Sequence, residues 1–166
     1  MKYLVSAFLF LSSIYCFTIL TWSNNGWQFL QPFLIVVLLF YFNTEDDWLP
    51  YILALISGLY LDSVGGIFGL YSVIFISLIF ILRTLQLTVF TARNMLTVIL
   101  LVVFSIIIFW LMFWLLNFLF AGYAYVFTWS LLGHIAKGAI ANLLIIILGH
   151  ILYYNFWLKL HERQSF

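Results

Sequence analysis

The fold is decided by residues 58–69, which read Gly58-Leu59-Tyr60-Leu61-Asp62-Ser63-Val64-Gly65-Gly66-Ile67-Phe68-Gly69. Asp62 is the only charged residue between Trp48 and Leu82. A carboxylate among so many apolar residues is costly in a bilayer, so it marks a functional or structural site. The glycines that follow it predict a turn between two helices.

The composition indicates that this chain lies in a membrane rather than in water. Hydrophobic residues make up 67% of the 166 residues and charged residues only 7%, whereas a soluble domain carries about 25% charged residues. Mean hydropathy is +1.22. The sequence therefore predicts an all-α integral membrane protein, formed by a single polytopic membrane domain over residues 1–166.

Polar and glycine-containing breaks divide the chain into about six transmembrane helices. The predicted spans are residues 3–22, 29–42, 48–61, 67–82, 95–120 and 128–158. No small-x-small cleavage pattern follows the first apolar segment, so we predict an uncleaved span rather than a signal peptide. Residues 83–93 mix basic, polar and apolar side chains and are expected to lie in the interface. The third span is short for a membrane crossing of roughly 20 residues and is predicted to form a hairpin with the fourth.

The distribution of basic residues predicts the orientation. Six spans that begin inside put Lys2, Arg83, Arg93, Lys159 and Arg163 on the cytoplasmic side. The positive-inside rule favours this arrangement, and an odd number of spans would split the set. Both termini are therefore expected in the cytoplasm.

Two predicted helices carry polar and small residues on one face. In the sixth span these residues are His134, Lys137, Gly138, Ala141, Asn142 and Gly149, and in the third they are Ala54, Ser57, Gly58 and Asp62. Small and polar side chains let membrane helices approach one another closely. We expect both faces to pack against protein rather than lipid, with His134, Lys137 and Asn142 forming an intramembrane polar face.

Asp62 has two competing interpretations. Lys137 is expected roughly 13 Å below the outer surface at 1.5 Å per residue, and Asp62 is expected near the outer end of the third span, so the two lone opposite charges could pair. Alternatively, Asp62 caps the start of the fourth helix or binds the backbone of the Gly65-Gly66 turn. For Lys137 the corresponding alternative is an extended side chain that reaches the interface.

Conventional catalytic motifs are missing from the sequence. It has no Gly-x-x-x-x-Gly-Lys loop, no His-Glu-x-x-His and no Gly-x-Ser-x-Gly. His134 and His150 are too far apart along one helix to share a metal, and the lone Cys16 cannot form an internal disulfide. The scattered basic residues form no patch for nucleic acid. We therefore predict a non-enzyme with no metal, no cofactor and no nucleic-acid partner.

The sequence resembles the MreD family, small polytopic proteins of the bacterial rod-shape machinery. The specific part of the resemblance is Gly58-Leu59-Tyr60-Leu61-Asp62 followed by Gly66-Ile67-Phe68-Gly69-Leu70-Tyr71. The motif thus includes Gly58, Asp62, Gly65, Gly66 and Gly69. Pro32 with the apolar run 34–41, and Phe109-Trp110 with the aliphatic residues after it, are also similar.

The resemblance implies a scaffold in the bacterial plasma membrane that associates with the bitopic protein MreC. Through MreC it would support a RodA-type polymerase, a class B penicillin-binding protein and MreB, surrounded by membrane lipids. The family is similar in helix arrangement to the substrate-binding subunits of energy-coupling-factor vitamin transporters. That similarity implies an alternative function, with a ligand pocket where Asp62, His134, Lys137 and Asn142 would converge.

Overall fold

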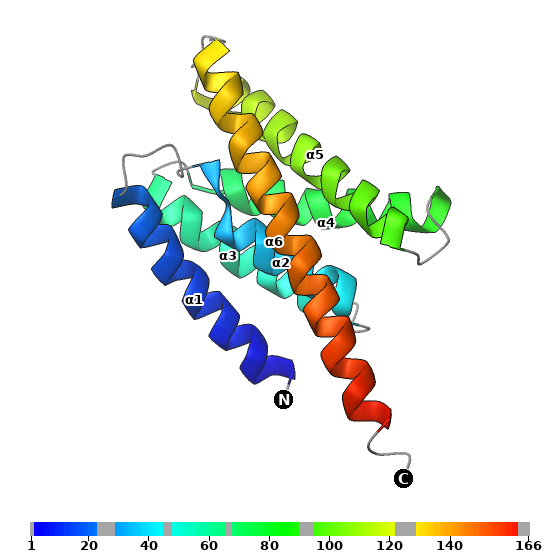
Figure 1. Ribbon diagram of the computed structural model, residues 1–166. Coiled ribbons are helices and arrows are strands. Elements are labelled where there is room, and N and C mark those ends of the chain that lie inside the picture. The colour runs from blue at the N-terminus through cyan, green and yellow to red at the C-terminus, as the bar shows by residue number, and fades with distance from the viewer. Residues whose placement is uncertain are drawn as a thin grey trace.

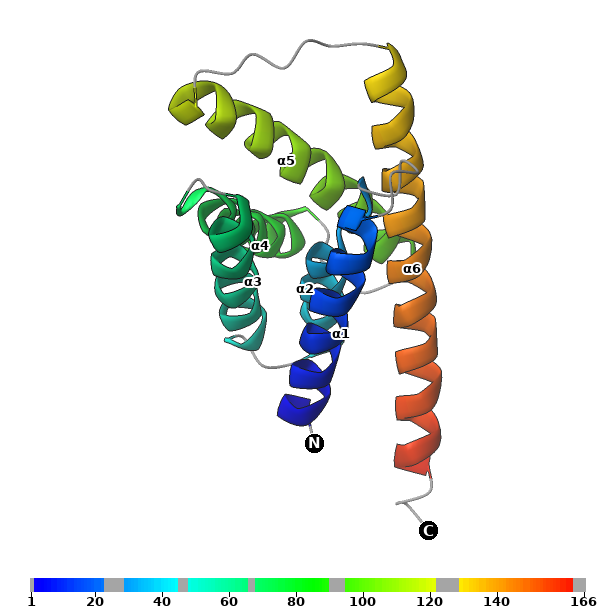
Figure 2. The ribbon, with the colours of Figure 1, turned by 90° about the vertical axis from the view of Figure 1, so that its left-hand side faces the viewer.

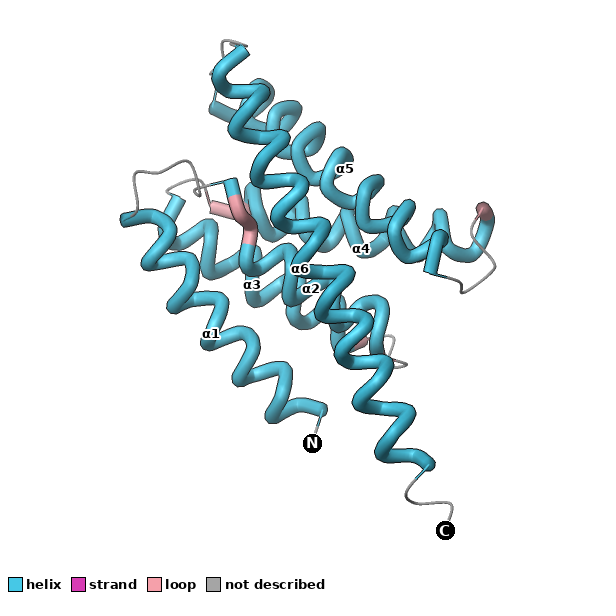
Figure 3. Tube along the Cα trace, in the orientation of Figure 1, coloured by secondary structure: helices cyan, strands magenta, loops and turns pink. Residues whose placement is uncertain are grey.

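The computed structural model describes residues 2–22, 29–44, 48–65, 68–89, 95–121 and 129–162. These residues form six α-helices and no strand (Figure 1). The helices are α1 (Lys2–Trp22), α2 (Pro32–Asn43), α3 (Leu49–Gly65), α4 (Leu70–Thr88), α5 (Met95–Ala121) and α6 (Trp129–Glu162). The prediction of an all-α membrane protein is confirmed, and Figure 3 shows how little of the described chain lies outside helices.

Four of the six helices are long and apolar enough to cross a membrane. They are α1, α4, α5 and α6. The other two are shorter, with 12 residues in α2 and 17 in α3. At 1.5 Å per residue α2 is only about 18 Å long, against a hydrocarbon core of about 30 Å. The chain is thus a multi-pass membrane protein with two additional, shorter apolar helices.

The helix boundaries differ from the predicted spans at several ends, including the start of α4 at Leu70 rather than residue 67 and the end of α6 at Glu162 rather than residue 158. α2 begins at Pro32 rather than at residue 29, because proline fits the first turn, where its missing N–H needs no partner. α3 continues past Asp62 to Gly65. α4 does not stop at Arg83 but runs to Thr88, so residues 83–88 are helix rather than a separate interfacial segment. Helical phase explains the extension, since it keeps Leu82 buried and Leu85 against the core.

α2 is the central helix of the bundle. It packs against α1, α3 and α6, while α4 packs against α3 and α5. Figure 2 shows α2 behind α1, with α3 and α4 side by side and the long α6 along the other flank. Phe33, Phe75 and Phe109 are the largest fully buried side chains. α2 is buried on nearly all sides, which is consistent with its predominantly apolar sequence.

α1 lies at the edge and presents most of its side chains to the surroundings. Few of its residues are buried within the protein, and Leu4, for example, is 76% exposed. Side chains of this kind are stable in lipid, not in water. The first residues of α1 and the last of α6 lie at the same end of the molecule in both views (Figures 1 and 2).

Candidate functional site

Asp62 caps the start of a neighbouring helix. Its Oδ1 accepts the backbone N–H of Tyr71 at 2.7 Å, and its Oδ2 accepts the backbone N–H of Ser72 at 3.2 Å. The Ser72 hydroxyl donates to the same Oδ2 at 2.6 Å. Asp62 is 2% exposed. Two of the N–H groups that every helix leaves without an intrahelical partner therefore find an acceptor on α3, at the end of α4 that favours negative charge.

The residue that would normally cap α4 contributes no side chain. Gly69 occupies the N-cap position with φ +89°, in the left-handed region, and is the only residue of the described chain with positive φ. Glycine adopts this conformation without steric cost. Gly69 has no side-chain oxygen. The carboxylate of Asp62, which lies on the preceding helix α3, therefore caps α4 instead.

Gly58 allows the two helices to approach closely enough for this cap. It lies one turn before Asp62, on the same face of α3 as the fully buried Ala54. A Cβ at Gly58 would meet the Cα of Ser72 and would lie 2.6 Å from its backbone nitrogen. Any side chain there would push α4 away from the Asp62 carboxylate.

The remaining glycines of the motif differ in their surroundings. A Cβ at Gly65 would lie 3.3 Å from the ring of Tyr71, whereas one at Gly69 would meet nothing within 4 Å. Gly66 lies outside the described residues. Close approach therefore explains Gly58, and backbone conformation explains Gly69.

Asp62 contacts α4 rather than Lys137. Its carboxylate binds the first turn of α4, as the capping alternative predicts, and no ion pair joins it to Lys137, although the structure describes both side chains. Lys137 is exposed on α6. Asp62 and Lys137, which were expected at a similar depth in the membrane, therefore do not form an ion pair in the structure.

Asn142 performs a similar task at the start of α2. It is fully buried, and its Oδ1 accepts the backbone N–H of Gln31 at 3.0 Å. Its Nδ2 donates to the carbonyl oxygen of Phe29 at 3.5 Å. Gln31 is the N-cap residue of α2 and makes no side-chain cap bond of its own. The starts of α2 and α4 are thus both held by a polar side chain from another helix.

Small and aromatic residues surround the Asn142 contact. A Cβ at Gly138 would lie 2.6 Å from the Cβ of Phe29 and 2.7 Å from its carbonyl oxygen. The His134 ring stacks on Phe29 with centroids 6.0 Å apart. The structure brings His134, Gly138 and Asn142 to the segment before α2 and leaves Lys137 apart from them.

Two further polar contacts involve residues that the sequence did not single out. The Tyr41 hydroxyl donates to Gln86 Oε1 at 2.7 Å, which joins α2 to α4, and His150 Nδ1 lies 2.8 Å from Asn43 Oδ1, which joins α6 to α2. Ser72 was missed as well, although its place at the third position of α4 is where an N-terminal cap binds. Gln86 was assigned to the interfacial segment because the end of α4 was predicted too early.

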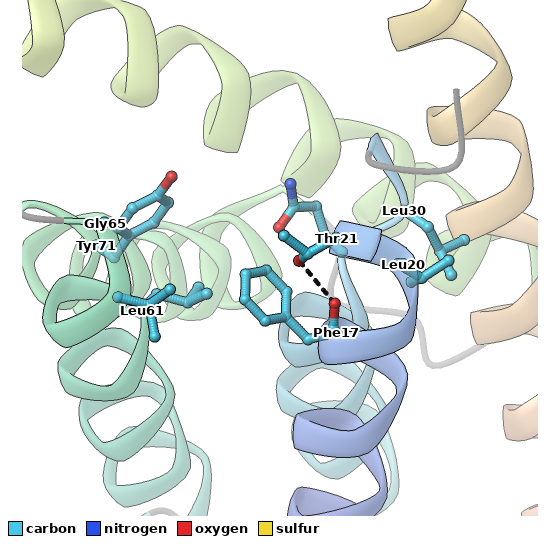
Figure 4. Close-up of a pocket in the computed structure, with 9 residues that line it drawn as sticks. Phe17, Leu20, Thr21, Leu30, Leu61, Gly65 and Tyr71 are labelled. Carbon is cyan, nitrogen blue, oxygen red and sulfur yellow. Dashed lines mark hydrogen bonds between the residues drawn. The ribbon is translucent and has the colours of Figure 1, made fainter. Parts of the chain in front are cut away.

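A cavity of about 230 Å³ opens between the ends of α1, α2, α3 and α4. Figure 4 shows Phe17 of α1 pointing toward Leu61 of α3 across it, with Tyr71 of α4 above Leu61 and Thr21 above Phe17. None of the nine described residues that line the cavity is charged. None of the four residues predicted to form a ligand pocket lines it.

Comparison of the chain with protein-family models, with curated proteins and with solved structures finds no match. Within the described ranges, no group of three or more His, Cys, Asp or Glu side chains could hold a metal ion. The features that bear on function are therefore the contacts of Asp62 and Asn142, the cavity and the sequence motif.

Proposed function

We propose that this chain is a non-enzymatic scaffold subunit of the bacterial cell-elongation machinery, located in the plasma membrane. It associates with an MreC-type bitopic protein and thereby supports peptidoglycan synthesis. Its indirect partners are a RodA-type polymerase, a class B penicillin-binding protein and the MreB filament. The observation that carries the proposal is the cap of Asp62 on α4, in which the carboxylate of the MreD-like motif accepts from Tyr71 of the same motif and from the neighbouring Ser72.

The contacts of Asp62 favour a structural role over a chemical one. A general base must lie within hydrogen-bond reach of the proton it removes. Three of the roughly four lone-pair sites of the Asp62 carboxylate already accept from α4, and the side chain is buried. Asn142 is likewise fully buried and bonded to the segment before α2. These side chains fix the positions of helices, which is what a scaffold needs.

The geometry does not favour the transporter alternative. Ligand pockets usually enclose about 300–1,000 Å³, and the cavity here is about 230 Å³. Asp62 and Asn142 turn toward helix ends rather than toward a common space, and Lys137 is exposed on α6. The described residues that line the cavity offer no charged group to a vitamin-sized solute.

Depletion of the protein in its rod-shaped or ovoid host tests the proposal. We expect rounded or widened cells, and normal shape on re-expression of the wild-type chain. Gly58→Leu should fail to restore shape because it separates α3 from α4, whereas Gly133→Ala should succeed because a Cβ at Gly133 meets nothing within 4 Å. Normal shape after depletion would contradict the proposal.

A further inference from the structure

The cavity between α1, α2, α3 and α4 has features that identify a class of ligand. Five of its nine described lining residues have large apolar side chains, and Phe17 on α1 points toward Leu61 on α3 (Figure 4). None of its described lining residues is charged, so a charged headgroup would be held there without a counter-ion. The space is smaller than usual solute pockets of about 300–1,000 Å³ and accommodates part of a narrow chain.

The position along α1 places the cavity close to the membrane interface. Phe17, Leu20 and Thr21 belong to the last two turns of this spanning helix. The next residue, Trp22, is 88% exposed, and exposed tryptophans collect where the hydrocarbon meets the headgroups. A molecule in this cavity would have its apolar part in the bilayer and its polar linkage near Thr21.

The Gln31 side chain is a polar group in the lining that is available for such a linkage. The Gln31 backbone N–H is bound by Asn142, but within the described chain its side-chain amide has no hydrogen-bond partner. The Thr21 hydroxyl already donates to the Phe17 carbonyl oxygen at 2.8 Å. The amide N–H of Gln31 is thus a neutral donor at the edge of an apolar space, and it suits a neutral acceptor such as an ester carbonyl.

We propose that this cavity binds the ester end of a lipid acyl chain, with the ester carbonyl accepting from the Gln31 side-chain amide. The apolar chain lies between Phe17 and Leu61, and the headgroup stays outside. This inference does not depend on the proposed function, because any membrane of ester lipids supplies the ligand.

Photo-crosslinking in vesicles tests the site directly. The full chain is reconstituted in phosphatidylethanolamine and phosphatidylglycerol, with a small fraction of phosphatidylglycerol that carries a diazirine on one acyl chain near the ester. After illumination, peptide mass spectrometry locates the adducts. We expect adducts on Phe17, Leu61 or Val64 in excess over adducts on Leu111, an exposed residue of α5. Equal labelling of the cavity and Leu111 would overturn the proposal.

A matched pair of threonine variants separates occupation of the cavity from general contact with lipid. Thr21 lines the cavity, whereas Thr18 does not, and both are exposed residues of α1 whose hydroxyls donate to the carbonyl one turn earlier at 2.8 Å. Thr21→Phe should abolish the cavity adducts and leave those on Leu111 unchanged. Thr18→Phe should change neither. Cavity adducts that persist in Thr21→Phe would show that the chain does not occupy this space.

The role of the Gln31 amide has its own readout. Competition with dodecanoic acid methyl ester should reduce the cavity adducts in the wild type more than competition with dodecane does. Gln31→Met keeps an unbranched side chain but removes the donor, so it should abolish that difference. The free acid distinguishes a lipid ester from a fatty acid, since its carboxylate finds no cation in the lining. A free acid that competes better than the ester would overturn the assignment.

Discussion

Asp62 and Ser72 are joined by two hydrogen bonds, because the backbone N–H and the hydroxyl of Ser72 both donate to Oδ2 of the carboxylate. A side chain of α3 thereby caps the start of α4. Tyr71 adds a third bond to the other oxygen. These hydrogen bonds connect α3 to α4, and their contribution to the stability of the protein can be measured.

Removal of the Asp62 carboxylate should destabilise the protein. Asp62→Ala leaves two buried N–H groups of α4 without an acceptor, at a cost of about 1–3 kcal/mol for each. Asp62→Asn keeps one acceptor oxygen and should cost less. Unfolding by dodecyl sulfate in mixed micelles measures both, with Ser63→Ala, an exposed position, as the control.

Double-mutant cycles identify the partner of Asp62. The coupling energy between Asp62→Ala and Ser72→Ala should fall at about 0.5–3 kcal/mol, the range for residues in contact. Asp62→Ala and Lys137→Ala should instead add to within about 0.5 kcal/mol, as separated residues do. Strong coupling to Lys137 would mean that the two charges meet after all.

Close approach at Gly58 predicts a contrast between two glycines. Gly58→Ala forces the α4 backbone at Ser72 to move, with a cost of about 1–3 kcal/mol for overpacking. Gly133→Ala adds a methyl group in open space and should be neutral or stabilising by up to about 1 kcal/mol, through helix propensity. Thermal unfolding in detergent compares the two. Equal effects would show that α3 and α4 do not depend on this contact.

Loss of the Asn142 acceptor should expose the start of α2. Asn142→Leu leaves the Gln31 N–H without its partner, so hydrogen exchange in the peptide that covers residues 29–35 should accelerate. Asn117→Leu is the matched control, since its amide donates only to Phe113 in its own helix. A similar acceleration in both variants would contradict a specific role for Asn142.

Apolar segments and glycines predicted most of the fold. The six segments, their order and the α3–α4 hairpin follow from hydropathy and from the turn signal after Asp62. Helix ends were less predictable, because Arg83 reads as a stop signal in sequence, whereas the contacts of Leu85 and Gln86 with other helices extend α4.

Asp62 and Asn142 were singled out from the sequence, but not all of their partners could be predicted. Asp62 was expected either to cap the fourth helix or to meet Lys137, and only the packing of α3 on α4 decides between these. The bond from Gln31 to Asn142 joins residues 111 positions apart. Such a pair leaves no mark in the spacing of either segment.

The distribution of basic residues predicts that both termini are cytoplasmic. Green fluorescent protein fused after Phe166 should fluoresce, and alkaline phosphatase at the same position should be inactive. Alkaline phosphatase inserted within residues 23–28 should be active, because that loop is expected on the opposite side. Phosphatase activity from the C-terminal fusion would contradict a cytoplasmic C-terminus.

Affinity purification of the tagged full-length chain from its host in mild detergent, followed by mass spectrometry, tests the proposed function most directly. We predict recovery of an MreC-type bitopic protein with wall-synthesis enzymes. Gly133→Ala should retain these partners and Gly58→Leu should lose them. Recovery of a transporter's ATPase module without any wall-synthesis protein would contradict the account.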